Sequence, residues 1–142
     1  MAHQLPPMVP TQLLIGGEWV SGAGPAVTIE DPSTGQALTE IMTASPEQLE
    51  EALSSVQAGF SEWKSWSSWQ RSEVLRRIAD IMRRDVAAFA WTMTLEQGKP
   101  LDQATAEVLA TADQFDWNAD EARRVYGRIV PSKTGSDQIF VY

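Results

Sequence analysis

The 142-residue chain contains no cysteine and only one histidine, His3. Without a thiol, the chain has no disulfide framework, no thiolate zinc site and no cysteine nucleophile. A single histidine with no neighbouring ligand cannot build a metal site, so we assign His3 no role. The composition therefore excludes several common catalytic and metal-binding arrangements.

Basic residues are also scarce, because 11 Lys and Arg stand against 19 Asp and Glu and give a formal net charge of -8. Binding to a nucleic-acid backbone needs clustered positive charge, so we expect no nucleic-acid partner. Four arginines do lie close together in the sequence: Arg76, Arg77, Arg83 and Arg84. They fall on the polar side of a predicted amphipathic helix, and we interpret them as a solvated face.

Long apolar runs are absent as well. No apolar stretch reaches about 18 residues, which excludes a membrane span, and residues 1–11 lack the basic region and apolar core of a secretory signal. We therefore expect no membrane partner and a cytoplasmic location. The 43% hydrophobic and 21% charged content is typical of one compact globular domain.

Two motifs that could suggest ligand binding are better explained by structure. Three tryptophans recur at every third position: Trp63, Trp66 and Trp69. A base-stacking platform would need basic residues among them, so packing in the core or against another domain is expected. The Gly16-Gly17 pair lacks the third glycine, the helix and the lysine of a phosphate-binding loop, which favours a tight hairpin turn.

Short apolar runs separated by turn residues predict strands near both ends of the chain. Residues 1–12 are rich in proline and are expected to form a flexible arm. The segment Asp31–Gly35 is a predicted turn, because proline follows the aspartate and glycine closes the segment. The predicted extended segments are 13–20, 27–30, 37–42, 129–131 and 138–142.

Between these strands, the spacing of apolar residues predicts four helices. The first begins after Ser45, which precedes proline and can form a capping box with Gln48. The second is expected from Ser72. Asp85 and Asp102 are the expected caps of the third and fourth helices.

The ends of the last two helices also carry signals. Gly98 can adopt the left-handed conformation that closes a helix, and Pro100 then presets φ and has no amide N–H to donate to the helix. We expect the fourth helix to run to about Val125, with Arg123 and Arg124 in its last turn. A DNA-binding helix-turn-helix at the Gly98 corner is incompatible with the acidic charge of the chain.

Several short motifs occur in a characteristic order: Thr94–Leu101, Ala106–Val108, Trp117, Asp120–Arg124 and Tyr126–Gly127. Together they resemble the N-terminal part of the NAD(P)-dependent aldehyde dehydrogenase superfamily. The resemblance covers roughly Leu13 to Tyr142 and looks closest to the semialdehyde-oxidising branch, such as succinate-semialdehyde dehydrogenase.

By its own pattern the chain is a mostly helical α+β fold with N-terminal β-hairpins, four helices and a C-terminal strand. The resemblance implies that it is a fragment of a three-layer α/β enzyme. Residues 13–131 would form the N-terminal part of the cofactor-binding domain, and residues 132–142 would begin the oligomerisation hairpin of a homodimer or homotetramer. The catalytic domain would lie outside this chain.

The resemblance also implies a function for the parent protein. Members of the family oxidise an aldehyde or semialdehyde to a carboxylic acid with NAD or NADP, using a cysteine nucleophile. The cofactor would be bound by a part of the parent outside this chain. Because the chain has no cysteine, we expect it to be inactive alone. The alternative is a non-catalytic helical interaction module or a degenerate paralogue.

Two sets of site residues follow from the resemblance. The fourth helix of the family lines the aldehyde entrance tunnel, which places Ala110, Gln114, Trp117 and Asn118 as substrate-tunnel candidates. Asn118 replaces the usual aromatic residue, so the wall is more polar and would suit a polar semialdehyde.

The second set is a monovalent cation site, which some members of the family hold. Glu96 with the backbone of Ile29 or Glu30 matches that pattern, and oxygen ligands suit a hard cation. Alternatively, Glu96 merely ends a helix or pairs with Lys99 or a more distant base.

Overall fold

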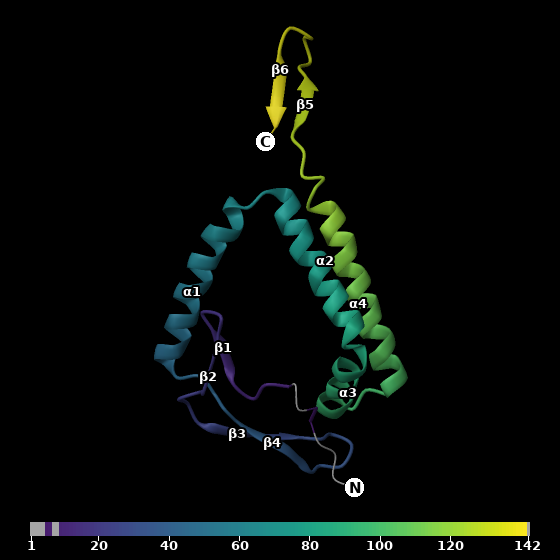
Figure 1. Ribbon diagram of the computed structural model, residues 1–142. Helices are drawn as coiled ribbons and strands as arrows, with labels where there is room; N and C mark the ends of the chain where they lie inside the picture. Colours follow the sequence, from purple (N-terminus) through teal and green to yellow (C-terminus); the bar gives the residue numbers. More distant parts are fainter. Residues whose placement is uncertain (1–4, 7–8, 142) are drawn as a thin grey trace.

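The computed structural model describes residues 5–6 and 9–141 of the chain. In this part, short hairpins flank a set of helices (Figure 1). The strands are β1 (Leu13–Ile15), β2 (Glu18–Val20), β3 (Ala26–Glu30), β4 (Ala37–Met42), β5 (Arg128–Pro131) and β6 (Gln138–Val141). The helices are α1 (Pro46–Ser65), α2 (Ser68–Arg84), α3 (Val86–Gln97) and α4 (Leu101–Glu121). The mostly helical α+β prediction is thus confirmed.

The strands pair only as antiparallel hairpins: β1 with β2, β3 with β4, and β5 with β6. Ile15 lies opposite Glu18, so the β1–β2 turn has two residues, Gly16 and Gly17. Their φ angles of 62° and 89° are both positive, as a type I′ turn requires. The predicted glycine turn is confirmed.

The turn between β3 and β4 is held by Asp31, which is 2% exposed. Its carboxylate accepts hydrogen bonds from the Ser33 amide at 2.8 Å and the Ser33 hydroxyl at 2.6 Å. The Asp31 amide donates to the Gln36 carbonyl at 2.9 Å. The aspartate therefore closes the turn through the local bonds that its side chain favours.

Capping boxes start the first two helices. Ser45 and Gln48 form the predicted box before α1. Ser67 and Gln70 form a second box, which the sequence reading missed, so α2 begins at Ser68 rather than near Ser72. The Ser67 hydroxyl accepts a hydrogen bond from the backbone N–H of Gln70 at 3.3 Å. In return, the side-chain oxygen of Gln70 accepts one from the backbone N–H of Ser67 at 2.9 Å.

The expected aspartate caps of the last two helices were wrong. The Asp85 side chain does not cap α3, because its two carboxylate oxygens accept from Arg84 at 3.0 and 2.6 Å. Helix α4 begins at Leu101 after Pro100, so Asp102 lies inside its first turn.

The end of α4 also differs from the prediction, because the helix stops at Glu121 and not near Val125. The amides of Arg123 and Arg124 donate to carbonyls three residues back, on Asp120 and Glu121, at 3.2 and 2.9 Å. Hydrogen bonds across three residues wind the chain more tightly than an α-helix and end α4 here. Both arginines therefore lie beyond the last helical residue.

The packed part of the molecule consists of α2, α3 and α4, which lie together in Figure 1. The buried apolar residues on these helices are Ala79, Ala90, Leu95, Ala104, Val108, Ala112 and Ala119. Most of them are alanines, whose small side chains let neighbouring helices approach closely. Leu95 is the largest apolar side chain that is fully buried.

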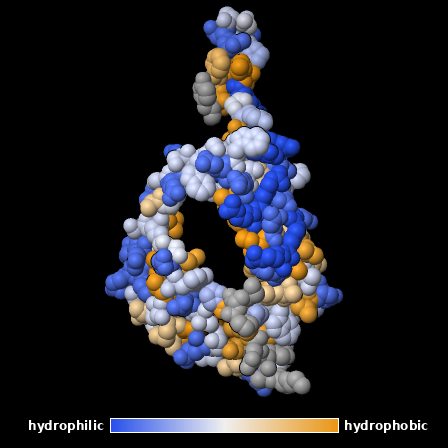
Figure 2. Space-filling model, in the orientation of Figure 1, coloured by the Kyte–Doolittle hydropathy of each residue, from blue (hydrophilic) through white to orange (hydrophobic). Residues whose placement is uncertain are grey.

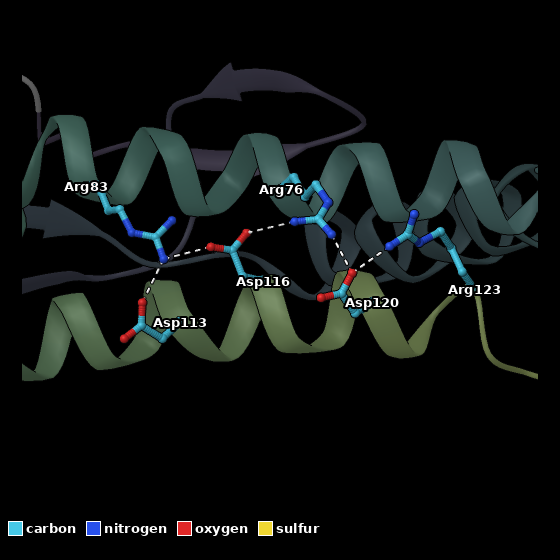
Figure 3. Close-up of polar contacts among 6 residues, drawn as sticks. All are labelled: Arg76, Arg83, Asp113, Asp116, Asp120 and Arg123. Atoms are coloured by element: carbon cyan, nitrogen blue, oxygen red, sulfur yellow. Dashed lines mark hydrogen bonds and ion pairs between the residues drawn. The ribbon is translucent and has the colours of Figure 1, made fainter.

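A ladder of ion pairs joins α2 to α4 along one edge (Figure 3). Arg83 lies 2.7 Å from both Asp113 and Asp116. Arg76 pairs with Asp116 at 3.7 Å and also with Asp120, which Arg123 contacts at 2.6 Å. The aspartate partners of Arg76 and Arg83 on a distant helix were not predicted. The solvated-face interpretation is nevertheless confirmed, because the side chains of all four arginines stay exposed, from 36% for Arg83 to 70% for Arg77 and Arg84.

The Gly98 corner between α3 and α4 packs against the β3–β4 turn. Gly98 has a φ of 72°, so the predicted left-handed helix end is confirmed. A Cβ atom placed on Gly98 would lie 3.2 Å from Cγ of Pro32. Only a residue without a side chain fits both the backbone and the contact.

Helix α1 stands apart from α2 and α4 (Figure 1), and none of its residues is buried. The space-filling view shows an opening between α1 and the packed helices (Figure 2). At the α1–α2 junction, the rings of Trp63 and Trp66 lie 5.4 Å apart, whereas Trp69 is exposed beneath the Arg123 guanidinium. The β5–β6 hairpin extends away from all the helices (Figure 1).

Candidate functional site

A groove of 470 Å³ runs along the C-terminal half of α4, where Leu75 of α2 closes one side. The residues that line it are Leu75, Gln114, Phe115, Asn118, Glu121, Ala122 and Val125. Its floor is apolar, and its polar groups come from α4. An apolar pocket with a few polar side chains is the usual form of a small-molecule site.

The groove contains two of the four predicted tunnel residues, Gln114 and Asn118. They lie four residues apart and therefore share one helical face. Ala110 is exposed and Trp117 is 66% exposed, and neither lines the groove. The structure thus brings Gln114 and Asn118 together and separates them from Ala110 and Trp117.

Glu121 also lines the groove, although the sequence analysis did not select it. It follows Gln114 by seven residues and Asn118 by three, so all three side chains fall on the same face of α4. This helical spacing is the signal that could have identified it. Arg124, which does not line the groove, donates to the Glu121 carboxylate at 2.9 Å.

The amide of Asn118 has a defined hydrogen bond. Its Nδ2 atom donates to the backbone carbonyl of Gln114 at 2.7 Å. This bond uses one of the two Nδ2 hydrogens, so the second N–H and the acceptor Oδ1 remain for the groove. Asn118 and Glu121 therefore both offer acceptor oxygens to the groove.

The ion-pair ladder fixes the rotation of α4 and so the direction of the groove face. Asp113, Asp116 and Asp120 meet the arginines of α2 on one edge of α4 (Figure 3), while Gln114 and Asn118 occupy another face. Hydrogen bonding to Arg123 lowers the pKa of Asp120, and the charges of Arg76 and Arg123 contribute further. These three carboxylates therefore serve to hold α4 against α2.

The predicted cation residues lie near a second hollow, of 380 Å³. Ile29 and Glu96 both line it, whereas Glu30 does not. Lys99 forms its ion pair with Glu107, so the alternative in which Lys99 neutralises Glu96 was wrong. Across residues 5–6 and 9–141, no group of three or more His, Cys, Asp or Glu side chains is placed to hold a metal ion.

The predicted arm of residues 1–12 lies partly outside the described residues, as do His3 and Tyr142. Of its described residues, Val9 and Pro10 line an apolar hollow of 200 Å³ with Ala88, Phe89 and Thr92 of α3. None of the helices that the structure describes is long and apolar enough to cross a membrane.

Comparison with known proteins places these features in a family. Residues 19–142 match the Aldehyde dehydrogenase family. The chain is 37% identical to 4-(hydroxymethyl)benzenesulfonate dehydrogenase TsaD1 of Comamonas testosteroni, over 92% of its own length and 28% of that protein. It is 33% identical to the mitochondrial succinate-semialdehyde dehydrogenase of Oryza sativa subsp. japonica, over 92% of its length and 25% of that protein.

A solved structure gives the same result for the fold. The chain superimposes on an aldehyde dehydrogenase from Brucella melitensis biovar abortus 2308 with a TM-score of 0.88 and 30% identity. The superposition covers 99% of this chain and 29% of that one. The predicted resemblance to the N-terminal part of the family is confirmed, and the chain spans little more than a quarter of the length of these relatives. The chain belongs to the aldehyde dehydrogenase family.

Proposed function

We propose that this chain is the N-terminal segment of an aldehyde dehydrogenase that oxidises a polar aldehyde or semialdehyde to the carboxylic acid with NAD(P)+. The single observation that carries the proposal is the groove on α4. It lies in a chain of this family and contains two of the residues, Gln114 and Asn118, that the resemblance assigned to the aldehyde tunnel.

In this proposal the chain contributes structure and one wall of the substrate path. Gln114 and Asn118 orient a polar substrate by hydrogen bonding, while Phe115 and Val125 contact its apolar part. The nucleophile comes from a catalytic domain outside the chain, because the chain contains no cysteine. NAD or NADP, which accepts the hydride, is bound by another part of the parent, the remainder of the cofactor-binding domain, which also lies outside this chain. The chain alone is therefore inactive.

The other parts of the proposal concern organisation. Residues 13–131 form the first part of a cofactor-binding domain, and residues 132–142 begin a hairpin through which subunits of a dimer or tetramer associate. The β5–β6 hairpin supports this role, since Ile129, Phe140 and Val141 are exposed on a segment that extends from the body. A cytoplasmic location completes the proposal.

We also propose that Glu96 and the backbone near Ile29 or Glu30 hold a monovalent cation. The support is that Ile29 and Glu96 face one hollow and that Lys99 is engaged by Glu107. A crystal structure determined in sodium or potassium tests this site. Density beside Glu96 with oxygen ligands is expected, and an electron-density map without such a peak would remove the proposal.

A helical interaction module remains the second candidate, because α1 exposes the apolar residues Leu49, Leu53, Val56 and Phe60. Intact mass under denaturing conditions separates the two. A natural protein of 15.7 kDa favours the interaction module, and one several times larger favours the enzyme.

Enzymatic function is tested in the larger protein by reduction of NAD(P)+ with a panel of aldehydes. Asn118→Phe, which adds an apolar ring to the groove, is expected to shift kcat/KM toward apolar aldehydes by about tenfold. Ala106→Phe is the matched control, because Ala106 is exposed on the same helix two turns before Gln114 and lies outside the groove lining. Equal shifts of kcat/KM in both variants, or no shift in Asn118→Phe, would show that the groove is not part of the substrate path.

A further inference from the structure

We infer that Leu75 of α2 is a specificity-determining residue of the groove. Its side chain forms an apolar wall that favours aldehydes with a ring-sized apolar body between the carbonyl group and a polar end group. This inference rests on the proposed function of the groove. It goes beyond that function by assigning part of the substrate preference to a helix that the family resemblance did not place at the substrate path.

The first step is the origin of the lining. Among the described residues around the groove, Leu75 is the contribution of α2, whereas the others lie on α4 or directly after it. The amide side chains of Gln114 and Asn118 belong to α4. The groove therefore has an apolar side chain on its α2 side and polar groups on its α4 side.

The second step is the packing that holds Leu75 at the groove. Leu75 follows Ser72 by three residues and precedes Ala79 by four, so the three side chains share one face of α2. Ser72 and Ala79 are 3% and 0% exposed, and Ala112 and Ala119 of α4 are both 0% exposed. Small residues let two helices approach closely. Leu75 is thus a large, half-buried side chain between two small buried ones.

The third step is the alignment of the two helices. Arg76, the neighbour of Leu75, pairs with Asp116 at 3.7 Å and also with Asp120 (Figure 3). These two aspartates lie two residues before and two residues after Asn118. The ion pairs therefore set Leu75 at the level of Asn118 along the groove, so that one ligand can contact both side chains.

The fourth step is the chemistry of this arrangement. The groove volume of 470 Å³ is sufficient for a ring and a short chain. An apolar ring beside Leu75 and Phe115 displaces water from both side chains, which is favourable, whereas a short polar aldehyde leaves them hydrated. The Asn118 amide keeps one N–H and its oxygen for the groove. It can therefore bind a polar end group that either donates or accepts a hydrogen bond.

The experiment compares two aldehydes in the intact aldehyde dehydrogenase that contains this segment. Both 3-hydroxypropanal and 3-(4-hydroxyphenyl)propanal carry a saturated aldehyde and a hydroxyl group, and the second has an aromatic ring between them. The reacting group is thus the same, and the ring is the main difference. The unmodified enzyme is expected to have the higher kcat/KM for 3-(4-hydroxyphenyl)propanal. A preference for 3-hydroxypropanal would overturn the inference.

Leu75→Asn keeps the approximate size of the side chain but makes it polar. It is expected to lower kcat/KM for 3-(4-hydroxyphenyl)propanal relative to 3-hydroxypropanal by about tenfold. Leu75→Met keeps an apolar side chain of similar volume and is expected to preserve the ratio. A ratio that falls as far in Leu75→Met as in Leu75→Asn would contradict an apolar wall.

Ile81→Asn is the matched control, because Ile81 lies on the same helix, is 38% exposed and does not line the groove. It makes a comparable change from an aliphatic to an amide side chain, and its ratio of kcat/KM values is expected to be unchanged. An equal fall in Ile81→Asn and Leu75→Asn would assign the effect to the stability of α2 and overturn the inference.

Melting temperatures establish that each variant is folded before its kinetics are compared. If Leu75→Asn does not fold, Leu75→Ala decides, because it removes the same apolar contact without adding a polar group. It is also expected to lower the ratio. A folded Leu75→Ala enzyme with an unchanged ratio would overturn the inference.

The outcomes separate this inference from the proposed function. Absence of NAD(P)+ reduction with every aldehyde removes the proposed function and the role of Leu75 with it. Efficient reduction of both aldehydes, with a ratio that neither Leu75→Asn nor Leu75→Ala changes, removes the role of Leu75 alone.

Discussion

Helices α1 and α4 are alike in length, 20 and 21 residues, and both have apolar residues at helical spacing, yet only α4 is packed. Helix α4 buries Ala104, Val108, Ala112 and Ala119 against its neighbours. Helix α1 buries none of its residues, and Phe60 is 57% exposed. Amphipathic spacing therefore identifies the face that can be buried, while burial itself requires a partner at the right distance.

The size of the side chains adds to this difference. The buried residues of α4 are mostly alanines, which allow α2 to approach closely and bring the charges of the ladder within reach. The apolar residues of α1 are large, and they suit a broad surface such as a sheet rather than a closely approaching helix. The two helices thus have sequences built for different partners.

Among changes to the packed helices α2, α3 and α4, Leu95→Ala is expected to lower stability the most. Leu95 is 1% exposed, so the change removes buried methyl groups and leaves a cavity among the helices. We expect the free energy of unfolding to fall by about 2–5 kcal/mol, measured by denaturant titration. Leu109→Ala, on an exposed part of α4, is the control and should cost far less. Equal losses would mean that the packed core is placed wrongly.

The corner that joins the packed helices to the β3–β4 turn should be the next most sensitive point. Gly98→Ala puts a side chain on a backbone with a φ of 72° and brings Cβ to 3.2 Å from Pro32. The left-handed conformation costs about 1–2 kcal/mol for a non-glycine residue. Gly59→Ala, within α1 and with open space around it, should instead leave stability unchanged or raise it. A stable Gly98→Ala protein would contradict the close contact.

The ladder should make the α2–α4 pairing sensitive to acid. Hydrogen bonding to Arg123 holds the pKa of Asp120 below its ordinary value of 3.8. A lowered folded-state pKa adds stability above the unfolded-state value, and this stability is lost as the pH falls through the folded-state pKa. The stabilisation is therefore complete at pH 7 and declines below about pH 4.

Asp120→Asn tests this dependence through melting temperatures measured from pH 7 to pH 3. The variant should melt slightly lower at pH 7, because the ladder is largely exposed, and the gap should close in acid. Asp80→Asn, at an exposed position on α2, is the control. A gap that stays constant down to pH 3 would show that the Asp120 charge is not what stabilises the pair.

Local signals predicted much of this fold because they need no distant partner. The Ser45 capping box, the Gly16-Gly17 turn and the Gly98 helix end all formed as expected. The prediction failed where a side chain could choose between two partners, or where its partner lies far away in the sequence. Asp85 binds Arg84 rather than capping a helix, and Arg83 finds its aspartates on α4. Such choices depend on which groups the tertiary structure brings near.

The candidate site likewise combines residues that the sequence predicted with others that only the tertiary structure identifies. The position of Gln114 and Asn118 on one face followed from the family resemblance and is matched by the groove. Ala110 lies one turn before Gln114 and so falls short of the groove, and Trp117 is turned toward solvent, where it is 66% exposed. Glu121 was recoverable from helical spacing alone, but its groove exists only because Leu75 of α2 closes it.

The smallest effect in the isolated chain is expected for Leu53→Ala on α1. Leu53 is 55% exposed, so its loss should change the free energy of unfolding by no more than about 0.5 kcal/mol. In the longer enzyme that we propose, the remainder of the protein covers this face, and the same change should cost about 2 kcal/mol or more. The comparison requires only two denaturation series, one in each context. A negligible effect in both would leave α1 without an internal partner, and its apolar face would then favour the interaction module over the enzyme scaffold.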